Sequence, residues 1–157
     1  MRFPESADTR VWFTPDAVLI ARRCIVENVA SSYEMRTLPS GVDDATLGAE
    51  IADALASVRP RTSEEMDSPL RAFATAYPDF DRFQDQFHSV GVVFRAQQAP
   101  DSIKLDGRAA GINKPNRILI PVGSSDAELG AAVRAILARL GPPPEPQPKK
   151  PTRSKSR

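Results

Sequence analysis

The sequence predicts an α+β domain built from two similar units, each made of antiparallel strands followed by one helix. Residues 39–58 (PSGVDDATLGAEIADALASV) and residues 121–140 (PVGSSDAELGAAVRAILARL), eighty-two positions apart, are identical at nine of twenty aligned positions. Each copy follows three short stretches rich in β-branched, aromatic and aliphatic residues, which is typical of strands. The gaps between these stretches are too short for crossover helices, so antiparallel pairing is expected. A repeat of this kind indicates a fold that uses one unit twice.

Six strands are expected, three before each copy of the repeat. Pro, Gly, Asn or Asp residues bound them, as they bound strands in general. In the fifth stretch Ile103 and Leu105 alternate with Lys104 and Asp106, which predicts one buried and one solvent-facing side. The expected strands are Arg10–Thr14, Ala17–Val26, Ser32–Leu38, Val90–Ala96, Ile103–Arg108 and Arg117–Val122.

A helix is expected in each copy of the repeat. Asp43 and Ser125 stand where an N-cap side chain accepts backbone N–H bonds, and Ser125 has capping-box spacing to Glu128. One apolar face is expected on each helix, formed by Leu47, Ile51, Leu55 and Val58 in the first and by Leu129, Val133, Ile136, Leu137 and Leu140 in the second. Glycine inside a helix costs about 0.8–1 kcal/mol relative to alanine. Gly48 and Gly130 therefore indicate a close approach of each helix backbone, which we expect to be to the sheet beneath it.

The two units, about 10–59 and 90–140, are expected to form one domain over residues 1–140, joined by a helical connector at about 63–87. Pro69 and Pro78 should divide this connector into short pieces. Its aromatic stripe, expected to be mostly core, consists of Phe73, Tyr77, Phe80, Phe83 and Phe87. Residues 141–157 form a Pro-rich tail without large apolar side chains and are expected to be disordered.

Composition limits the class of protein. The 157 residues suffice for one moderate core, and 41% hydrophobic with 26% charged residues is an ordinary globular balance. No apolar stretch approaches the roughly 18 residues of a membrane span, and the first thirty residues lack a secretory signal, so the protein is expected to be cytoplasmic. The tail carries net +4, which leaves about −3 on residues 1–140 of the total +1.

The sequence contains almost no recognisable catalytic residues or motifs, and we therefore expect no enzymatic activity. Cys24 lies in an apolar stretch without a nucleophile signature, and the lone His88 cannot build a histidine metal site. The glycines of KLDGRAAG and PVGS lack the spacing of phosphate-binding loops. Asp79 and Asp81 could in principle bind a divalent ion, but adjacent acidic residues are also common at the start of a helix, where they complement the helix dipole. No cofactor and no metal are therefore expected.

The repeated cassette D-A-x-L-G-A, ending in an apolar helix, together with the central PLRAFATAYPDFDRFQDQFHSVGVVF, resembles immunity proteins of contact-dependent growth inhibition systems. The resemblance covers about residues 30–140. It implies a non-catalytic protein that binds and neutralises the C-terminal toxin domain of a large surface exoprotein, often a nuclease. It also implies an architecture similar to the Whirly fold, with two pseudo-symmetric units.

The alternative is a Whirly-like module that binds single-stranded nucleic acid through its sheet and basic tail. The negative charge of the body and the lack of an aromatic-basic strand motif count against it. The sequence identifies neither the toxin nor the oligomeric state.

The toxin-binding surface is expected among acidic residues, because nucleases that grip phosphates are basic around the active cleft. The preferred cluster is Asp43, Asp44, Glu50 and Asp53 on the first helix, whose counterparts in the second copy are Ser125, Asp126, Ala132 and Ala135. Acids that the second copy lacks are not required by a shared scaffold. The second cluster consists of Glu64, Glu65, Asp67, Asp79, Asp81 and Asp85 in the connector. Both clusters have the alternative explanation of a solvated surface.

Overall fold

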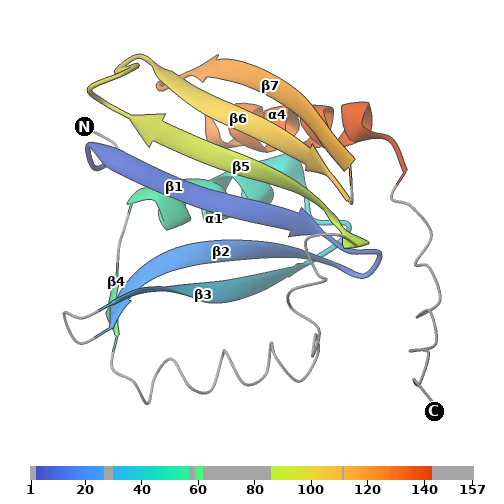
Figure 1. Ribbon diagram of the computed structural model, residues 1–157, viewed down its shortest axis with the longest axis horizontal. Helices are drawn as coiled ribbons and strands as arrows, with labels where there is room; N and C mark the ends of the chain where they lie inside the picture. Colours follow the sequence, from blue (N-terminus) through green and yellow to red (C-terminus); the bar gives the residue numbers. More distant parts are fainter. Residues whose placement is uncertain (1–2, 27–29, 57–58, 62–85, 111, 143–157) are drawn as a thin grey trace, which may run out of the picture.

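In the part of the chain that the structure describes, the fold is α+β: an antiparallel sheet with two helices (Figure 1). The computed structural model describes residues 3–26, 30–56, 59–61, 86–110 and 112–142. The elements follow one another along the chain as β1 (Ser6–Phe13), β2 (Ala17–Val26), β3 (Ala30–Pro39), α1 (Asp44–Ala56), β4 (Arg59–Arg61), β5 (His88–Arg95), β6 (Ser102–Ala109), β7 (Ile112–Pro121) and α4 (Asp126–Leu140).

The strand order in the sheet is β3-β2-β1-β5-β6-β7, and all of these neighbours are antiparallel. The central pair, β1 and β5, is in register over its full length, from Ser6 opposite Arg95 to Phe13 opposite His88. The short strand β4 pairs in parallel with the end of β2. Antiparallel pairing, expected from the short connections, is confirmed.

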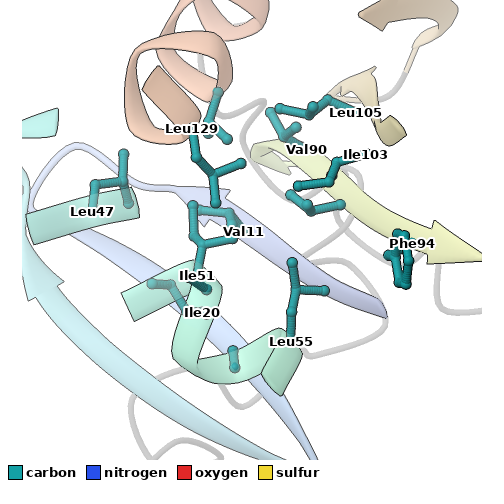
Figure 2. Packing of buried hydrophobic residues seen from close by; sticks show 14 of the residues in the cluster. Val11, Ile20, Leu47, Ile51, Leu55, Val90, Phe94, Ile103, Leu105 and Leu129 are labelled. Atoms are coloured by element: carbon teal, nitrogen blue, oxygen red, sulfur yellow. The ribbon is translucent and has the colours of Figure 1, made fainter. Parts of the chain in front are cut away.

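Both helices pack on the same face of the sheet and against each other (Figure 1). Figure 2 shows Leu47, Ile51 and Leu55 of α1 and Leu129 of α4 meeting side chains of β1, β2, β5 and β6. On β6 the core side chains alternate with more exposed ones, as expected for Ile103 and Leu105. Burial of the apolar faces of the two helices is confirmed for Leu47, Ile51, Leu55, Leu129, Val133 and Ile136, whereas Leu137 and Leu140 are half-buried and Val58 lies outside the described residues.

The glycines inside the helices contact the opposite helix, not the sheet as expected. A Cβ atom at Gly48 would lie closer than 3.0 Å to the backbone oxygen of Asp126, and one at Gly130 would overlap the backbone oxygen of Asp44 in the same way. Each glycine thus faces the first turn of the other helix. The expectation of close approach is confirmed, but its partner was wrong because sequence periodicity does not say which element covers a helix face.

The beginnings of the two helices are capped as expected. The side chain of Asp43 accepts a hydrogen bond of 2.6 Å from the backbone N–H of Thr46. Ser125 and Glu128 form a complete capping box at the start of α4, in which each side chain accepts from the backbone N–H of the other residue.

The expected bounds of the strands agree with the structure only in part, and some of the expected segments lie outside the described residues. Strand β2 has the expected bounds, whereas β1, β3, β5, β6 and β7 begin before the expected residues. The short strand β4 was not expected. All but the last two residues of the predicted connector (63–87), and the tail from residue 143 onward, lie outside the described residues. In the part of the chain that the structure describes, neither helix is long and apolar enough to cross a membrane.

Candidate functional site

The preferred acidic cluster lies on helix α1 and at its N-cap, where β2, β3 and α4 supply basic neighbours. Asp53, on the third turn, receives a hydrogen bond from the guanidinium of Arg22 in β2. The Arg22 side chain is only 8% exposed, whereas that of Asp53 is 49% exposed. The pair therefore joins a buried cation to a carboxylate at the surface, and it fixes the orientation of Asp53.

Glu50 and Asp44 have arginine partners as well. Nε of Arg36 in β3 lies 2.7 Å from Oε2 of Glu50. Nε of Arg134 in α4 lies 2.9 Å from Oδ1 of Asp44, and the same guanidinium donates to the carbonyl oxygen of Val42. Arg134 thereby ties the first turn of α1 to α4.

Asp43 differs from the other three acids because its carboxylate binds backbone at the N-cap of α1. Hydrogen bonds from Thr46, first from its backbone N–H and then from its side chain, lower the pKa of the Asp43 carboxyl below its usual value. Arg134 adds a smaller electrostatic contribution in the same direction. Asp43 is fully exposed, so this carboxylate is ionised and faces solvent at neutral pH.

The structure therefore gives three of the four acids an arginine partner, from β2 and β3 for Asp53 and Glu50 and from α4 for Asp44. Sequence reasoning missed these arginines, although the repeat carries a signal for one of them. Eighty-two positions after Arg36 stands Ile118, and its acid Glu50 has the counterpart Ala132. This arginine and its acid thus differ together between the two copies, which indicates a pair within the chain.

The second acidic cluster could not be placed. Its members, Glu64, Glu65, Asp67, Asp79, Asp81 and Asp85, lie outside the described residues. Within the described ranges no group of three or more His, Cys, Asp or Glu residues is arranged to hold a metal ion.

His88, the lone histidine, joins three parts of the fold. The backbone N–H of Ala110 donates to Nδ1 over 2.8 Å, and Nε2 lies 2.9 Å from the carbonyl oxygen of Gly141. Because Nδ1 accepts, the ring proton is on Nε2, which donates to Gly141. Both ring nitrogens thus bind backbone, so His88 has no nitrogen left for a catalytic pair with Cys24.

A shallow pocket of about 270 Å³ lies beside His88, between the β1–β2 turn and the end of α4. Its walls are mostly apolar, with Phe13, Val18 and Leu137 contributing, and Arg134 supplies a charge. Arg134 already forms an ion pair with Asp44 and a hydrogen bond to the carbonyl oxygen of Val42, and both ring nitrogens of His88 are hydrogen-bonded to backbone groups. The two titratable side chains of the pocket, Arg134 and His88, are therefore used by the fold.

The face of the sheet opposite the helices is basic over β1, β5, β6 and β7. Its ion pairs join Asp8 to Arg95 over 3.2 Å, and Asp106 to both Arg117 and Lys104 over 2.9 Å and 3.6 Å. Strand alternation places Arg10 and Arg108 on the same face. Arg10 donates to Oγ of Ser89, and its guanidinium lies over Gly91. This face carries five basic side chains and two acids among the described residues, so it has an excess of positive charge.

The comparisons with known proteins give a likeness of fold. The sequence matches no known family pattern and no curated protein. Among solved structures the chain is similar to NMB0488, a protein of unknown function from Neisseria meningitidis, with 15% sequence identity and a TM-score of 0.58. The similarity covers 87% of this chain and 96% of that one.

Proposed function

We propose that this chain is a non-catalytic immunity protein of a contact-dependent growth inhibition system, which binds and neutralises a cognate toxin domain, expected to be a nuclease. The proposal rests on the sequence resemblance and on the surface that α1 presents. It places the protein in the cytoplasm, where an incoming toxin would act. It also includes the pseudo-symmetric, Whirly-like architecture that the resemblance implies.

The element bounds support that architecture. Strands β5 and β7 begin and end eighty-two residues after β1 and β3, and α4 begins eighty-two residues after α1. This is the separation of the two sequence repeats. The reciprocal contacts of Gly48 with Asp126 and of Gly130 with Asp44 agree with a two-fold relation between the helices.

The observation that carries the functional proposal is the set of oriented carboxylates on α1. Arg22 and Arg134 hold the carboxylates of Asp53 and Asp44 while leaving 49% and 45% of these side chains exposed. A carboxylate that is already fixed loses little conformational freedom when it binds a partner. Asp43 adds an exposed negative charge at the N-terminus of α1. Together these groups suit the basic cleft of a nuclease, where electrostatic complementarity raises the association rate and the specificity.

The proposal is tested with the toxin domain encoded beside this chain. The wild-type protein should bind that domain in a pull-down and protect cells that express it. Asp43→Ser removes the charge of Asp43 but keeps a side chain that caps α1. Combined with Asp44→Asn, it should slow association, and the loss should shrink as salt is added.

A matched control is Asp101→Asn, which removes an exposed acid from the turn between β5 and β6. This variant should bind and protect like the wild-type protein. Lack of binding and protection by the wild-type chain would overturn the functional proposal. Full binding by the α1 variant would leave the function standing and reject α1 as the interface.

A single-stranded nucleic-acid-binding module remains the second candidate, favoured by the basic face over β5, β6 and β7. Basic side chains that neutralise phosphates make binding fall steeply with salt. This function predicts that the full chain retards a labelled oligonucleotide at low salt, and that Arg108→Gln with Arg117→Gln weakens the complex. An unretarded oligonucleotide at low salt would remove this candidate.

A further inference from the structure

The outer edge of β7 has an apolar character that nothing else on the described surface shares. Strand β7 pairs only with β6 among the described strands and forms the sheet edge opposite β3 (Figure 1). Leu119, in its second half, is 61% exposed and is the one large apolar side chain exposed among the described residues. Its neighbours Ile118 and Ile120 are half-buried against the core. The run Ile118–Ile120 thus presents apolar side chains at an open strand edge.

The register with β6 shows which backbone groups of β7 are free to pair. The N–H of Val122 donates to the carbonyl oxygen of Asp101 over 2.8 Å, and the register continues regularly down to Asn116 opposite Gly107. Backbone groups in an antiparallel strand alternate in direction from one residue to the next. The N–H and C=O groups of Arg117 and Leu119 therefore point away from β6. Pro115 and Pro121, each three residues from Ile118, lack an N–H and bound this pairing window.

Natural proteins block exposed strand edges with charged side chains, prolines or short strands. In β7 the prolines stand at the two ends of the window and leave the residues between them free of this block. The only charge in the window is Arg117, which is neutralised by Asp106 over 2.9 Å. The window is therefore short, but its middle carries no unpaired charge that would oppose a second strand.

We propose that the chain self-associates through β7, with a second copy added antiparallel about a two-fold axis at Ile118. In this register Arg117 lies opposite Leu119 of the second copy, and the two residues exchange two backbone hydrogen bonds. The two-fold axis produces the same pair a second time, with Leu119 opposite Arg117 of the second copy. Ile118 faces Ile118 of the second copy in a non-hydrogen-bonded pair, where side chains approach most closely. The sheet then continues from one copy into the other.

The window fits a copy of itself in both hydrogen bonding and charge. In the two-fold register Pro115 lies opposite Pro121 of the second copy, so the ladder ends without an N–H that lacks a partner. Arg117 lies opposite Leu119 of the second copy rather than opposite another arginine, and Asp106 neutralises its charge within each chain. Apolar contacts across the axis come from Ile118 and Leu119. Because the window is short, the dimer belongs to the small, weak class of interfaces.

The test is the mass of the full chain in solution, measured by sedimentation equilibrium from about 10 μM to about 1 mM, a range suited to weak association. The weight-average mass should rise from the 17.1 kDa of one chain toward twice that value. Leu119→Lys should weaken the association at least about tenfold, because two apolar side chains lose their contacts at once. Leu119→Pro should have a similar effect, because it removes an outward N–H but none that bonds β6.

The matched control is Thr37→Lys, which places the same charge on the β3 edge at the position eighty-two residues before Leu119. It should associate like the wild-type chain. Thermal unfolding of each variant at low concentration establishes that the fold is retained. A chain that stays monomeric up to the highest concentration, or a dimer that Leu119→Lys leaves intact, would overturn the proposal.

Cysteine cross-linking fixes the register in a background of Cys24→Ala. Residues in a non-hydrogen-bonded antiparallel pair have Cα atoms about 4.5 Å apart, within reach of a disulfide. Ile118→Cys should therefore form a covalent dimer on mild oxidation. Leu119→Cys should not, because Leu119 of the second copy is a diagonal neighbour. The reverse pattern would reject this register.

Discussion

Gly48 in helix α1 packs directly on the backbone carbonyl of Asp126 in the first turn of α4, so closely that no side chain fits between them. Gly130 in α4 makes the reciprocal contact with the carbonyl of Asp44 in α1. Arg134, one turn beyond Gly130, holds the same first turn of α1 through Asp44 and Val42. The two helices are thus joined at two close backbone contacts and one ion pair, and the sheet beneath is covered by the pair as a unit.

Alanine at either helix glycine should destabilise the protein, although alanine is the better helix former by about 1 kcal/mol. The added methyl group would overlap backbone atoms, which cannot rotate away, and such overpacking costs about 1–3 kcal/mol or more. Gly48→Ala and Gly130→Ala should therefore each lower the free energy of unfolding by about 2 kcal/mol or more. Urea denaturation followed by circular dichroism measures this difference.

Gly41→Ala is the control, because nothing lies within 4 Å of a Cβ atom at Gly41. This change should alter the free energy of unfolding by less than about 0.5 kcal/mol. Stabilisation by Gly48→Ala would contradict the close contact between the helices.

The strands could be predicted where local sequence and tertiary pairing agree. Strand β2 has the predicted bounds because AVLIARRCIV is apolar over most of its length and contains four β-branched residues. Strand β1 begins four residues before the prediction, since the polar Ser6 and Asp8 are held in the strand by pairing with β5. Strand β4, with the sequence RPR, carries no strand signal of its own. Its extended form comes from pairing with β2, which no local sequence pattern predicts.

The acids of the candidate site were predicted as residues but not as pairs. Helical spacing places Glu50 and Asp53 on the same side of α1, and the sequence alone suffices for that. Their partners Arg36 and Arg22 come from two different strands, and their proximity depends on how α1 lies across the sheet. That arrangement is tertiary, since α1 packs on β1 and β2 as well as on α4, and helical spacing alone does not give it.

The two arginine–carboxylate pairs on α1 should contribute unequally to stability. Arg22 is buried, and loss of its carboxylate partner leaves a charge poorly solvated, whereas Arg36 is 56% exposed. Asp53→Ala should lower the free energy of unfolding by about 1–2 kcal/mol, a value reduced from that of a fully buried pair because Asp53 is half-exposed. Glu50→Ala should cost less, about 0.5 kcal/mol, because the arginine that it leaves behind is exposed to water, although Glu50 itself is only 20% exposed.

Double-mutant cycles with Arg22→Met and Arg36→Met isolate the two coupling energies. A larger loss of stability for Glu50→Ala than for Asp53→Ala would contradict the argument from the exposure of the two arginines. The same measurements separate stability from partner binding when acids of α1 are replaced.

The ring of His88 should carry its proton on Nε2 and not on Nδ1, because Nδ1 accepts from the backbone N–H of Ala110. The sequence contains one histidine, so the nitrogen NMR spectrum of the imidazole ring reports this residue alone. His88→Leu would leave the N–H of Ala110 and the carbonyl of Gly141 without their partner. We expect it to lower the free energy of unfolding by about 2–3 kcal/mol, the cost of unpaired buried polar groups. A proton found on Nδ1 would contradict this geometry.

The N-cap of α1 should make stability depend on pH through Asp43. Its pKa is lowered in the folded protein by the hydrogen bonds from Thr46, so the folded state binds a proton at Asp43 less readily than the unfolded chain does. The stabilisation is therefore present above the unfolded pKa, near 3.8, and is lost as the pH falls through the lower folded value. Asp43→Asn should lower the midpoint of urea unfolding at pH 7, and the difference from the wild-type protein should shrink as the pH is lowered below 3.8. Ser125, the cap of α4, is not ionisable, so the effect of Ser125→Ala should change little over the same range. A constant difference for Asp43→Asn across this range would show that the charge of Asp43 does not contribute to the cap.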